Sequence, residues 1–257
     1  MEKEQLIRLV SSVGNGAHVF APREWLNEKV LIVRLGKNDI KEQIFEIIYP
    51  YLDKIISVVL YGSHARKEAT ESSDIDVLII SKEKFVIPKQ DKIDILVVPE
   101  DKIEKAIELN PIMMYSLFRE GVALINEQYL DKLREIKINF KLFKSFLEET
   151  FLSLNSDKEL LDLDKNTGKF ASSALIYSLF LRLRGIFILY CFSNKKVYSN
   201  TLFRKWIIEN CKINYEKFYF SYVSVRDNQK IKDEILINEA QELLNFLERE
   251  LIGLNLK

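Results

Sequence analysis

Two aspartates, Asp74 and Asp76, stand two residues apart at the start of a strongly apolar strand pattern. Aspartate is depleted in strands because its short polar side chain competes with the ladder hydrogen bonds, so this pair requires a reason. Residues i and i+2 of a strand point to the same face, which places the two Cα atoms roughly 7 Å apart. Like charges held this close repel one another unless a cation lies between them. Mg²⁺, which prefers carboxylate and phosphate oxygens, suits the pair.

A third carboxylate, Asp94, lies in the next predicted strand, residues 93–98. If that strand lies beside residues 74–80, Asp94 reaches the same metal centre. Asp74 and Asp76 would then hold two Mg²⁺ ions, and Asp94 would bind the ion that activates the acceptor and could serve as general base. The alternatives are turn caps or surface ion pairs for Asp74 and Asp76, and a solvent-facing strand residue for Asp94.

A Gly62-Ser63 turn follows the buried strand predicted for residues 56–60. Such a turn presents unpaired backbone N–H groups at the start of a helix, where an anion is favoured. Gly62 lets the backbone approach a phosphate closely, and Ser63 adds a hydroxyl donor. Arg66 lies one turn further and could meet either a phosphate or an acidic residue. Together with the carboxylates, these residues predict nucleotidyl transfer from a nucleoside triphosphate.

The set Gly62-Ser63, Asp74-Ile75-Asp76 and Asp94 resembles the DNA polymerase β-like nucleotidyltransferase superfamily. The closer variant Gly-Ser-x-Ala-Arg followed by Ser-Asp-x-Asp, whose second serine is Ser73, is similar to small prokaryotic nucleotidyltransferases. That group includes antitoxin-type enzymes paired with helical toxins, and it resembles antibiotic adenylyltransferases. The resemblance covers about residues 40–126, and Lys67 departs from it where many relatives carry Gly.

The resemblance implies an α/β (α+β) core with a mixed sheet. It implies Mg²⁺-dependent transfer of a nucleoside monophosphate, most often AMP from ATP, to a hydroxyl acceptor. The nucleotide-binding set that it implies is Gly62, Ser63, Arg66 and Ser73, with Asp74, Asp76 and Asp94 as catalytic and metal-binding residues.

The elements that position these residues fall into three segments. Residues 1–36 are expected to form a small β element, 37–138 a nucleotidyltransferase domain and 139–257 a helical domain that binds the acceptor or a partner. In the first segment we expect strands over 6–13, 17–21 and 29–35, a turn at Gly14-Asn15-Gly16 and a helical turn after Pro22. In the second, we expect Asn38 to cap a helix over 39–55. We expect strands over 56–60, 74–80 and 93–98, and an edge strand over 122–125. One further helix should start at 99–101, and another should precede Gly121. In the third, helices are expected within 168–191 and over 201–211, 215–226 and 234–252.

The N-terminal segment resembles AbrB-like swapped hairpins through Gly14-Asn15-Gly16-Ala17-His18-Val19, Pro22, Trp25 and Val30. Such modules form intertwined dimers, and some bind DNA. A segment this short cannot bury a core alone, so it must dimerise or pack on the catalytic core. The alternative to the AbrB-like interpretation is a small β subdomain that packs on the core.

Tyr222 and Arg226 lie four residues apart on one face of the predicted helix 215–226. They are candidates to hold the base or the acceptor in the catalytic cleft. A structural role, in which they lock helices together, is the alternative.

The composition restricts the remaining possibilities. The 257 residues are 47% hydrophobic, with 38 Lys+Arg balanced by 38 Asp+Glu, which favours a globular protein over a generally basic nucleic-acid binder. Two cysteines and two histidines make a disulfide framework or a Cys/His zinc site improbable. The longest apolar run, 171–191, is interrupted by Arg182 and Arg184, so no membrane span is expected. The N-terminus lacks a signal-peptide pattern, and a cytoplasmic location is expected.

A second function of another class stays open at this point. The chain could be an antitoxin-like or DNA-binding regulator that dimerises through residues 1–36, with a helical protein as partner. The acceptor, the base selectivity and the oligomeric state do not follow from the sequence.

Overall fold

The computed structural model describes residues 8, 10–30, 32, 40–70, 73–230 and 234–255. The chain divides into two compact units, one of residues 1–104 with 121–136 and one of residues 105–120 with 137–257. We call them the sheet unit and the helical unit. Residues 105–120, assigned to the catalytic segment on sequence grounds, thus group with the helices.

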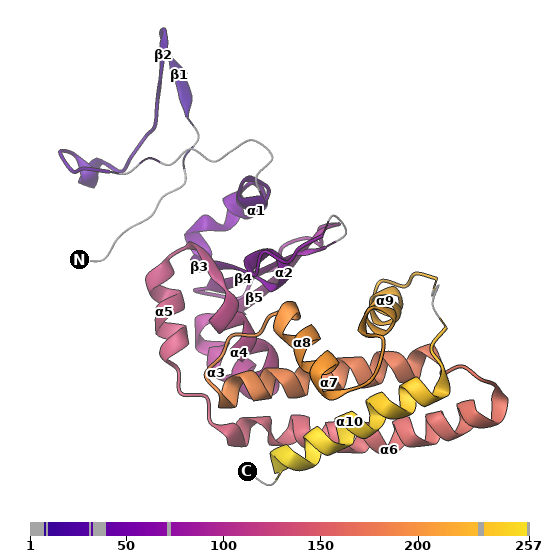
Figure 1. The fold of residues 1–257 in the computed structure, drawn as a ribbon. Helices are drawn as coiled ribbons and strands as arrows, with labels where there is room; N and C mark the ends of the chain where they lie inside the picture. The colour runs from indigo at the N-terminus through magenta and orange to yellow at the C-terminus, as the bar shows by residue number, and fades with distance from the viewer. Residues whose placement is uncertain are drawn as a thin grey trace. The chain divides into compact units, whose positions relative to one another are not determined.

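A four-stranded mixed sheet forms the centre of the sheet unit, in the order β5-β4-β3-β6 (Figure 1). The strands are β3 (Ile55–Tyr61), β4 (Ile75–Ser81), β5 (Ile93–Pro99) and β6 (Val122–Ile125). β3 pairs antiparallel with both β4 and β6, whereas β4 pairs parallel with β5. The predicted α/β fold with a mixed sheet is therefore confirmed, and 122–125 is an edge strand as expected.

Helix α1 (Ile40–Ile48) covers one face of this sheet. Its buried Ile44 and Ile48 belong to the same apolar cluster as Val58, Val77 and Ile79. The predicted single helix over 39–55 is wrong beyond residue 48, where a 3₁₀ segment, η2 (Tyr49–Lys54), takes over. Pro50 lacks the N–H that an α-helix interior needs, which explains the change. The predicted cap Asn38 lies outside the described residues.

Asn126 joins three elements of the sheet unit at the end of β6. Its backbone is left-handed, with φ 59°, and its side-chain Oδ1 accepts a bond from the N–H of Tyr129, which caps α5 (Glu127–Glu135). Its Nδ2 donates to the carbonyl of Ile56 at 3.0 Å, and Ser57 Oγ donates to the carbonyl of Ile125 at 2.9 Å. These bonds hold α5 against β3, an arrangement that the sequence analysis did not anticipate.

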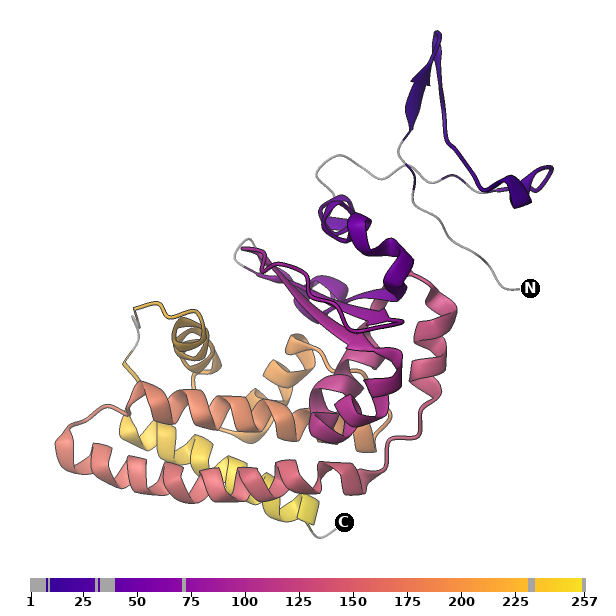
Figure 2. The ribbon, with the colours of Figure 1, turned by 180° about the vertical axis from the view of Figure 1, so that it is seen from behind.

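Helices that flank the strand β6 along the chain belong to different units. η3 (Glu100–Lys102) leads into α3 (Ile103–Leu109), and α4 (Pro111–Glu120) precedes Gly121, as predicted. The helical unit further contains η4 (Phe140–Phe143), α6 (Lys144–Thr167), α7 (Ser173–Ser193), α8 (Asn200–Asn210), α9 (Tyr215–Arg226) and α10 (Ile237–Asn255). The predicted helices correspond to α7, α8, α9 and α10, whereas the long α6 was not specified in advance. Figure 2 shows α6, α7 and α10 running side by side, and the three helices contact one another.

Helix α7 supplies much of the core of the helical unit. By length and composition alone it could cross a membrane, which differs from the expectation drawn from Arg182 and Arg184. Most of its apolar side chains are nevertheless buried against the other helices, among them Leu175, Leu179, Leu183 and Leu189. A long apolar helix is also what the centre of a helix bundle requires.

The N-terminal segment contains a short hairpin. Its strands are β1 (Ser11–Val13) and β2 (Gly16–His18), followed by the 3₁₀ turn η1 (Arg23–Trp25) after Pro22. Gly14 adopts φ 53° in the connecting turn, as the Gly-Asn-Gly pattern predicts. The strand predicted over 29–35 is absent at residues 29, 30 and 32, and its other positions lie outside the described residues, as does much of 6–10.

Candidate active site

A row of three residues crosses the sheet where β3 ends and β4 and β5 begin. Tyr61 is the cross-strand partner of Asp76, and Asp76 is the partner of Asp94. Directly paired residues point to the same face, so the two carboxylates project together from neighbouring strands about 5 Å apart. The prediction that the strand of Asp94 lies beside that of Asp76 is therefore confirmed. The parallel direction of the two strands and their register did not follow from the sequence.

Gly62 and Asp76 fit closely against one another. Gly62 follows Tyr61 with φ 72°, a conformation that side chains other than glycine rarely adopt. A Cβ atom at this position would collide with Oδ2 of Asp76 and would lie 2.9 Å from its Cγ. The absence of a side chain at residue 62 therefore makes room for the carboxylate of Asp76 as well as for any phosphate.

The Gly-Ser turn leads into a single helical turn, α2 (Gly62–Ala65), that ends in a Schellman motif. The N–H of Glu68 bonds the carbonyl of Ser63 at 2.9 Å, and the N–H of Lys67 bonds that of His64 at 3.2 Å. Lys67 occupies the left-handed position of this motif with φ 59°, where glycine is favoured. This explains physically why relatives can carry Gly here, and it shows that the departure at Lys67 keeps the turn.

Arg66 has an acidic partner within the same loop. Its Nε lies 2.8 Å from Oε2 of Glu68, and the two side chains are only 7% and 16% exposed. The sequence left two roles open for Arg66, a phosphate contact or an ion pair, and the structure shows the ion pair with Glu68. Glu68 was missed on sequence grounds, although an opposite charge two residues away in a tight loop is a usable signal. A phosphate contact by Arg66 stays a prediction.

Ser73, which directly precedes Asp74, makes polar contacts with Thr70 and His64. Ser73 Oγ accepts a bond from the N–H of Thr70 at 2.9 Å, so this hydroxyl closes the turn before β4. His64 Nε2 lies 3.4 Å from the carbonyl oxygen of Ser73 and ties α2 to the same turn. Asp74 directly precedes β4 and is exposed, like Asp94, whereas Asp76 is half-buried.

The donor chemistry of this edge fits a hard cation. Asp74, Asp76 and Asp94 offer only carboxylate oxygens, which Mg²⁺ prefers, and the row at Asp76 and Asp94 concentrates negative charge. Within the described ranges, no group of three or more His, Cys, Asp or Glu side chains is close enough to hold a metal ion. The backbone thus brings the positions together, while the three carboxyl groups do not converge on one point.

Tyr222 and Arg226, predicted to hold the base or the acceptor, have partners inside the helical unit. Tyr222 is 4% exposed, and its ring stacks on Tyr177 at 5.3 Å between centroids. Arg226 forms two contacts with Asp227, at 2.6 and 3.1 Å. Tyr222 thus packs between helices, as in the structural alternative, whereas Arg226 pairs with its chain neighbour Asp227, and contact of either residue with a base or an acceptor stays a prediction.

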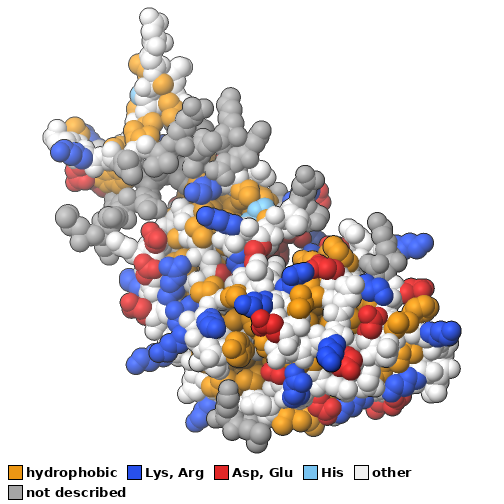
Figure 3. Space-filling model, in the orientation of Figure 1, with side chains coloured by type: hydrophobic (Ala, Val, Ile, Leu, Met, Phe, Trp, Pro, Cys, Tyr) orange, Lys and Arg blue, Asp and Glu red, His pale blue; other side chains and the backbone are white. Residues whose placement is uncertain are grey.

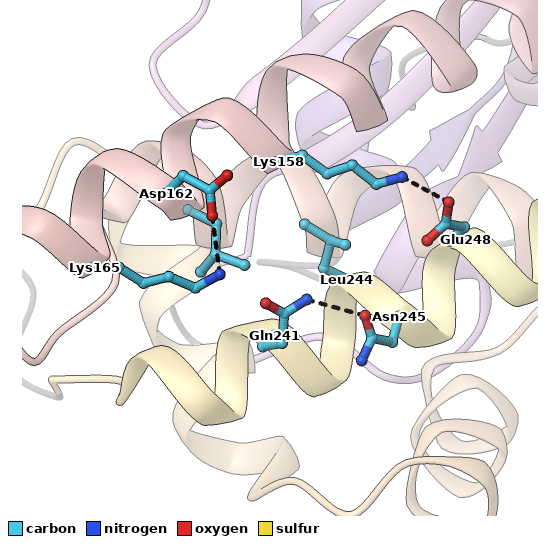
Figure 4. Close-up of a pocket in the computed structure, with 8 residues that line it drawn as sticks. Lys158, Asp162, Lys165, Gln241, Leu244, Asn245 and Glu248 are labelled. Atoms are coloured by element: carbon cyan, nitrogen blue, oxygen red, sulfur yellow. Dashed lines mark hydrogen bonds and ion pairs between the residues drawn. The ribbon is translucent and has the colours of Figure 1, made fainter.

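A groove lies between α6 and α10 of the helical unit (Figure 4). Lys158 pairs with Glu248 at 2.6 Å, Lys165 with Asp162 at 2.9 Å, and Gln241 donates to Asn245 at 3.0 Å. The charged groups of this groove neutralise one another. Figure 3 shows the same mixture of both signs across the face of the molecule that it displays, in line with the balanced composition.

Comparison with known proteins places the Gly-Ser turn and the aspartates in a recognised domain. A model of the nucleotidyltransferase domain matches residues 41–157. A Methanocaldococcus jannaschii protein named "Putative protein adenylyltransferase MJ0126" is 34% identical over 97 residues, which cover 36% of this chain and 90% of that protein.

A second relative from the same organism is matched over a smaller part of its length. "Putative protein adenylyltransferase MJ1305" is 31% identical over 70 residues, covering 27% of this chain and 38% of that protein. Among solved structures, spectinomycin adenyltransferase AAD(9) of Enterococcus faecialis, with ATP and spectinomycin, aligns with a TM-score of 0.46 and 15% identity. That alignment covers 82% of this chain and 97% of the other.

Proposed function

The chain belongs to the nucleotidyltransferase family, and from this premise we propose that it transfers AMP from ATP to a hydroxyl group of an acceptor. The observation that carries the proposal is the row Tyr61, Asp76 and Asp94 beside Gly62. It combines a glycine turn suited to binding a phosphate with paired carboxylates at one end of neighbouring strands, an arrangement that supports phosphoryl chemistry.

In the proposed reaction the acceptor oxygen bonds to the α-phosphorus of ATP, and the bond from that phosphorus to the bridging oxygen breaks. Pyrophosphate leaves, and the proton of the acceptor hydroxyl passes to the carboxylate of Asp94. Asp74, Asp76 and Asp94 would hold two Mg²⁺ ions, which when bound supply positive charge to the attacking and leaving oxygens. The backbone of Gly62 and the hydroxyl of Ser63 would hold the outgoing phosphates.

A protein hydroxyl is the first acceptor to test. The names of both Methanocaldococcus jannaschii relatives specify protein adenylyl transfer, and this supports AMP as the transferred group. The acceptor that the family resemblance suggests is a small helical partner protein.

The test uses ATP labelled at the α-phosphate together with Mg²⁺ and candidate acceptors. Asp76→Asn and Asp94→Asn should each lower labelling and pyrophosphate release at least about a hundred-fold, because they remove a ligand or the base. Asp91→Asn, an exposed aspartate in the loop before β5, is the matched control and should turn over like the wild type. Equal turnover of Asp76→Asn and the wild type would refute the assignment.

A second proposal concerns residues 1–36, which we propose dock on a second copy of the chain. Large apolar side chains of this segment are exposed, including Phe20 at 69%, Leu26 at 66% and Ile32 at 67%. A two-stranded hairpin cannot bury such side chains by itself. Residues 1–36 carry five basic and four acidic side chains, a net charge of +1, so the charge of this segment gives little support for a DNA contact.

The double variant Phe20→Ser, Leu26→Ser of the full chain tests this second proposal. The wild type should sediment as a dimer and the variant as a monomer, because the apolar contact area would be lost. An unchanged sedimentation coefficient, or a monomeric wild type at micromolar concentration, would count against dimerisation through this segment.

A further inference from the structure

Arg184 differs from the ion-paired arginines of the helical unit. Arg182, Arg204, Arg226 and Arg249 each lie within ion-pair distance of a carboxylate. Arg184, on α7, makes no such pair among the residues that the structure describes. Its Nε is buried and has no hydrogen-bond partner there. A buried guanidinium group without an anion is unfavourable, because five N–H donors and a full charge must be satisfied.

Two tyrosines from other segments, Tyr198 and Tyr222, lie beside this guanidinium group. Its Cζ lies 5.2 Å from the ring centroid of Tyr198, in the loop that connects α7 to α8. The hydroxyl of Tyr198 donates to Oδ1 of Asn200 at 2.6 Å, which fixes the ring. Tyr222 approaches from α9 and is itself held by stacking on Tyr177. The arginine is therefore positioned before any ligand arrives.

The local charges keep this group cationic. The pKa of Arg184 is raised, chiefly by Tyr198 and against the effect of burial, with smaller contributions from Tyr222 and Glu120. Phenol oxygens are neutral acceptors at ordinary pH and do not neutralise the guanidinium charge. By its exposed surface the residue as a whole is intermediate between buried and exposed, whereas its Nε is buried.

We propose that Arg184, framed by Tyr198 and Tyr222, is the anchor of an oxyanion site in the helical unit, which binds a ligand that carries a phosphate or carboxylate group. A planar fork of N–H donors matches either group in a bidentate manner, and an anion would satisfy the orphaned Nε. The site is built from residues of the helical unit alone, and binding there requires neither Mg²⁺ nor turnover.

The test measures thermal unfolding of the full chain in EDTA, with phosphate, pyrophosphate or malonate added. Sodium chloride at equal ionic strength controls for general salt effects. At tenfold excess over its Kd, the preferred anion should raise the unfolding midpoint by about 3 °C. A shift with phosphate and pyrophosphate alone identifies a phosphate site, and a shift with malonate identifies a carboxylate site.

Variants assign the shift to Arg184. Arg184→Gln should weaken the anion at least about tenfold, whereas Arg182→Gln, two residues away and paired with Glu149, should bind within twofold of the wild type. Arg184→Lys keeps the positive charge but loses the planar set of N–H donors, and it too should weaken anion binding. This variant provides the test if Arg184→Gln does not fold. Unchanged binding by the Arg184 variants, or no midpoint shift of the wild type with any of the anions, would overturn the proposal.

Discussion

At the scale of single residues, Gly62 and Asp76 illustrate how a motif acquires its geometry. The sequence explained Gly62 by the close approach of a phosphate. The structure adds that the carboxylate of Asp76 fills the space where a side chain would stand. The glycine is therefore needed for the fit of Asp76, in addition to the proposed approach of a phosphate.

Gly62→Ala is expected to damage both stability and activity. The left-handed backbone disfavours alanine by about 1–2 kcal/mol, and the added methyl group must displace Asp76. Denaturant unfolding should show a loss of about 2 kcal/mol or more, with transferase activity falling further than stability explains. Gly14→Ala, at φ 53° in an open turn, carries the backbone penalty without a collision and should leave activity unchanged.

If Gly62→Ala retained wild-type activity, Asp76 would be free to move without consequence. The proposed role of its carboxylate would then be wrong.

At the scale of elements, the ends of helices follow a shared pattern. α2, α7 and α9 finish in Schellman motifs with Lys67, Lys195 and Asn228 in the left-handed position. Glycine is the usual residue there, and this chain contains only 8 glycines. The motif is held by its hydrogen bonds as well as by the left-handed residue, so these three helices end in it although none of them has a glycine there.

The packing of α6 against α7 buries a carboxyl group, Asp157, which is 2% exposed. Burial raises its pKa from 3.8 to about 6, while the hydrogen bond from Ser178 at 3.0 Å and the charge of Arg182 oppose the rise. Because the folded-state pKa is above the unfolded value, the stabilising contribution is complete below pH 3.8 and is lost as the pH rises through about 6.

Asp157→Asn should therefore stabilise the protein at pH 8 by about 1–3 kcal/mol, and this gain should vanish below pH 4. Urea unfolding at several pH values measures the difference. Asp162→Asn, on the exposed side of the same helix, should change stability by less than about 0.5 kcal/mol at every pH. A loss of stability in Asp157→Asn at pH 8 would mean that the ionised carboxylate is required.

At the scale of the whole molecule, the chain leaves the sheet unit at residue 104, returns at 121 and leaves again at 136. The segment 105–120 thus belongs to the helical unit, although strands flank it in the sequence. Tyr115 of α4 lies with its ring edge against Phe192 of α7, 4.9 Å between centroids, and is 6% exposed.

Tyr115→Ala should accordingly weaken the helical unit. A loss of about 3 kcal/mol is expected for removing a buried aromatic side chain, and it should appear as faster hydrogen exchange in α7. Leu109→Ala removes a side chain that is 76% exposed and should change neither stability nor exchange. Unaltered exchange in α7 of the Tyr115 variant would place α4 outside the cooperative helical unit.

The sequence by itself determined the parts that depend on neighbouring residues. Strand alternation, the Gly-Ser turn and the i, i+2 spacing of Asp74 and Asp76 are local signals, and they predicted β3, α2, β4 and β5 closely. The family resemblance rested on the same local residues. Helices with strong apolar runs, such as α7 and α9, were predicted for the same reason.

Tertiary structure alone decided which distant residues meet. The pairing of Asp76 with Asp94, the burial of Tyr222 on Tyr177 and the buried Nε of Arg184, which has no hydrogen-bond partner among the described residues, all depend on strand register and helix packing. Register and packing are set by the fit of whole apolar faces, which no short window of sequence contains. The chemistry of the candidate site could therefore be predicted from the sequence, whereas its geometry depends on the tertiary structure.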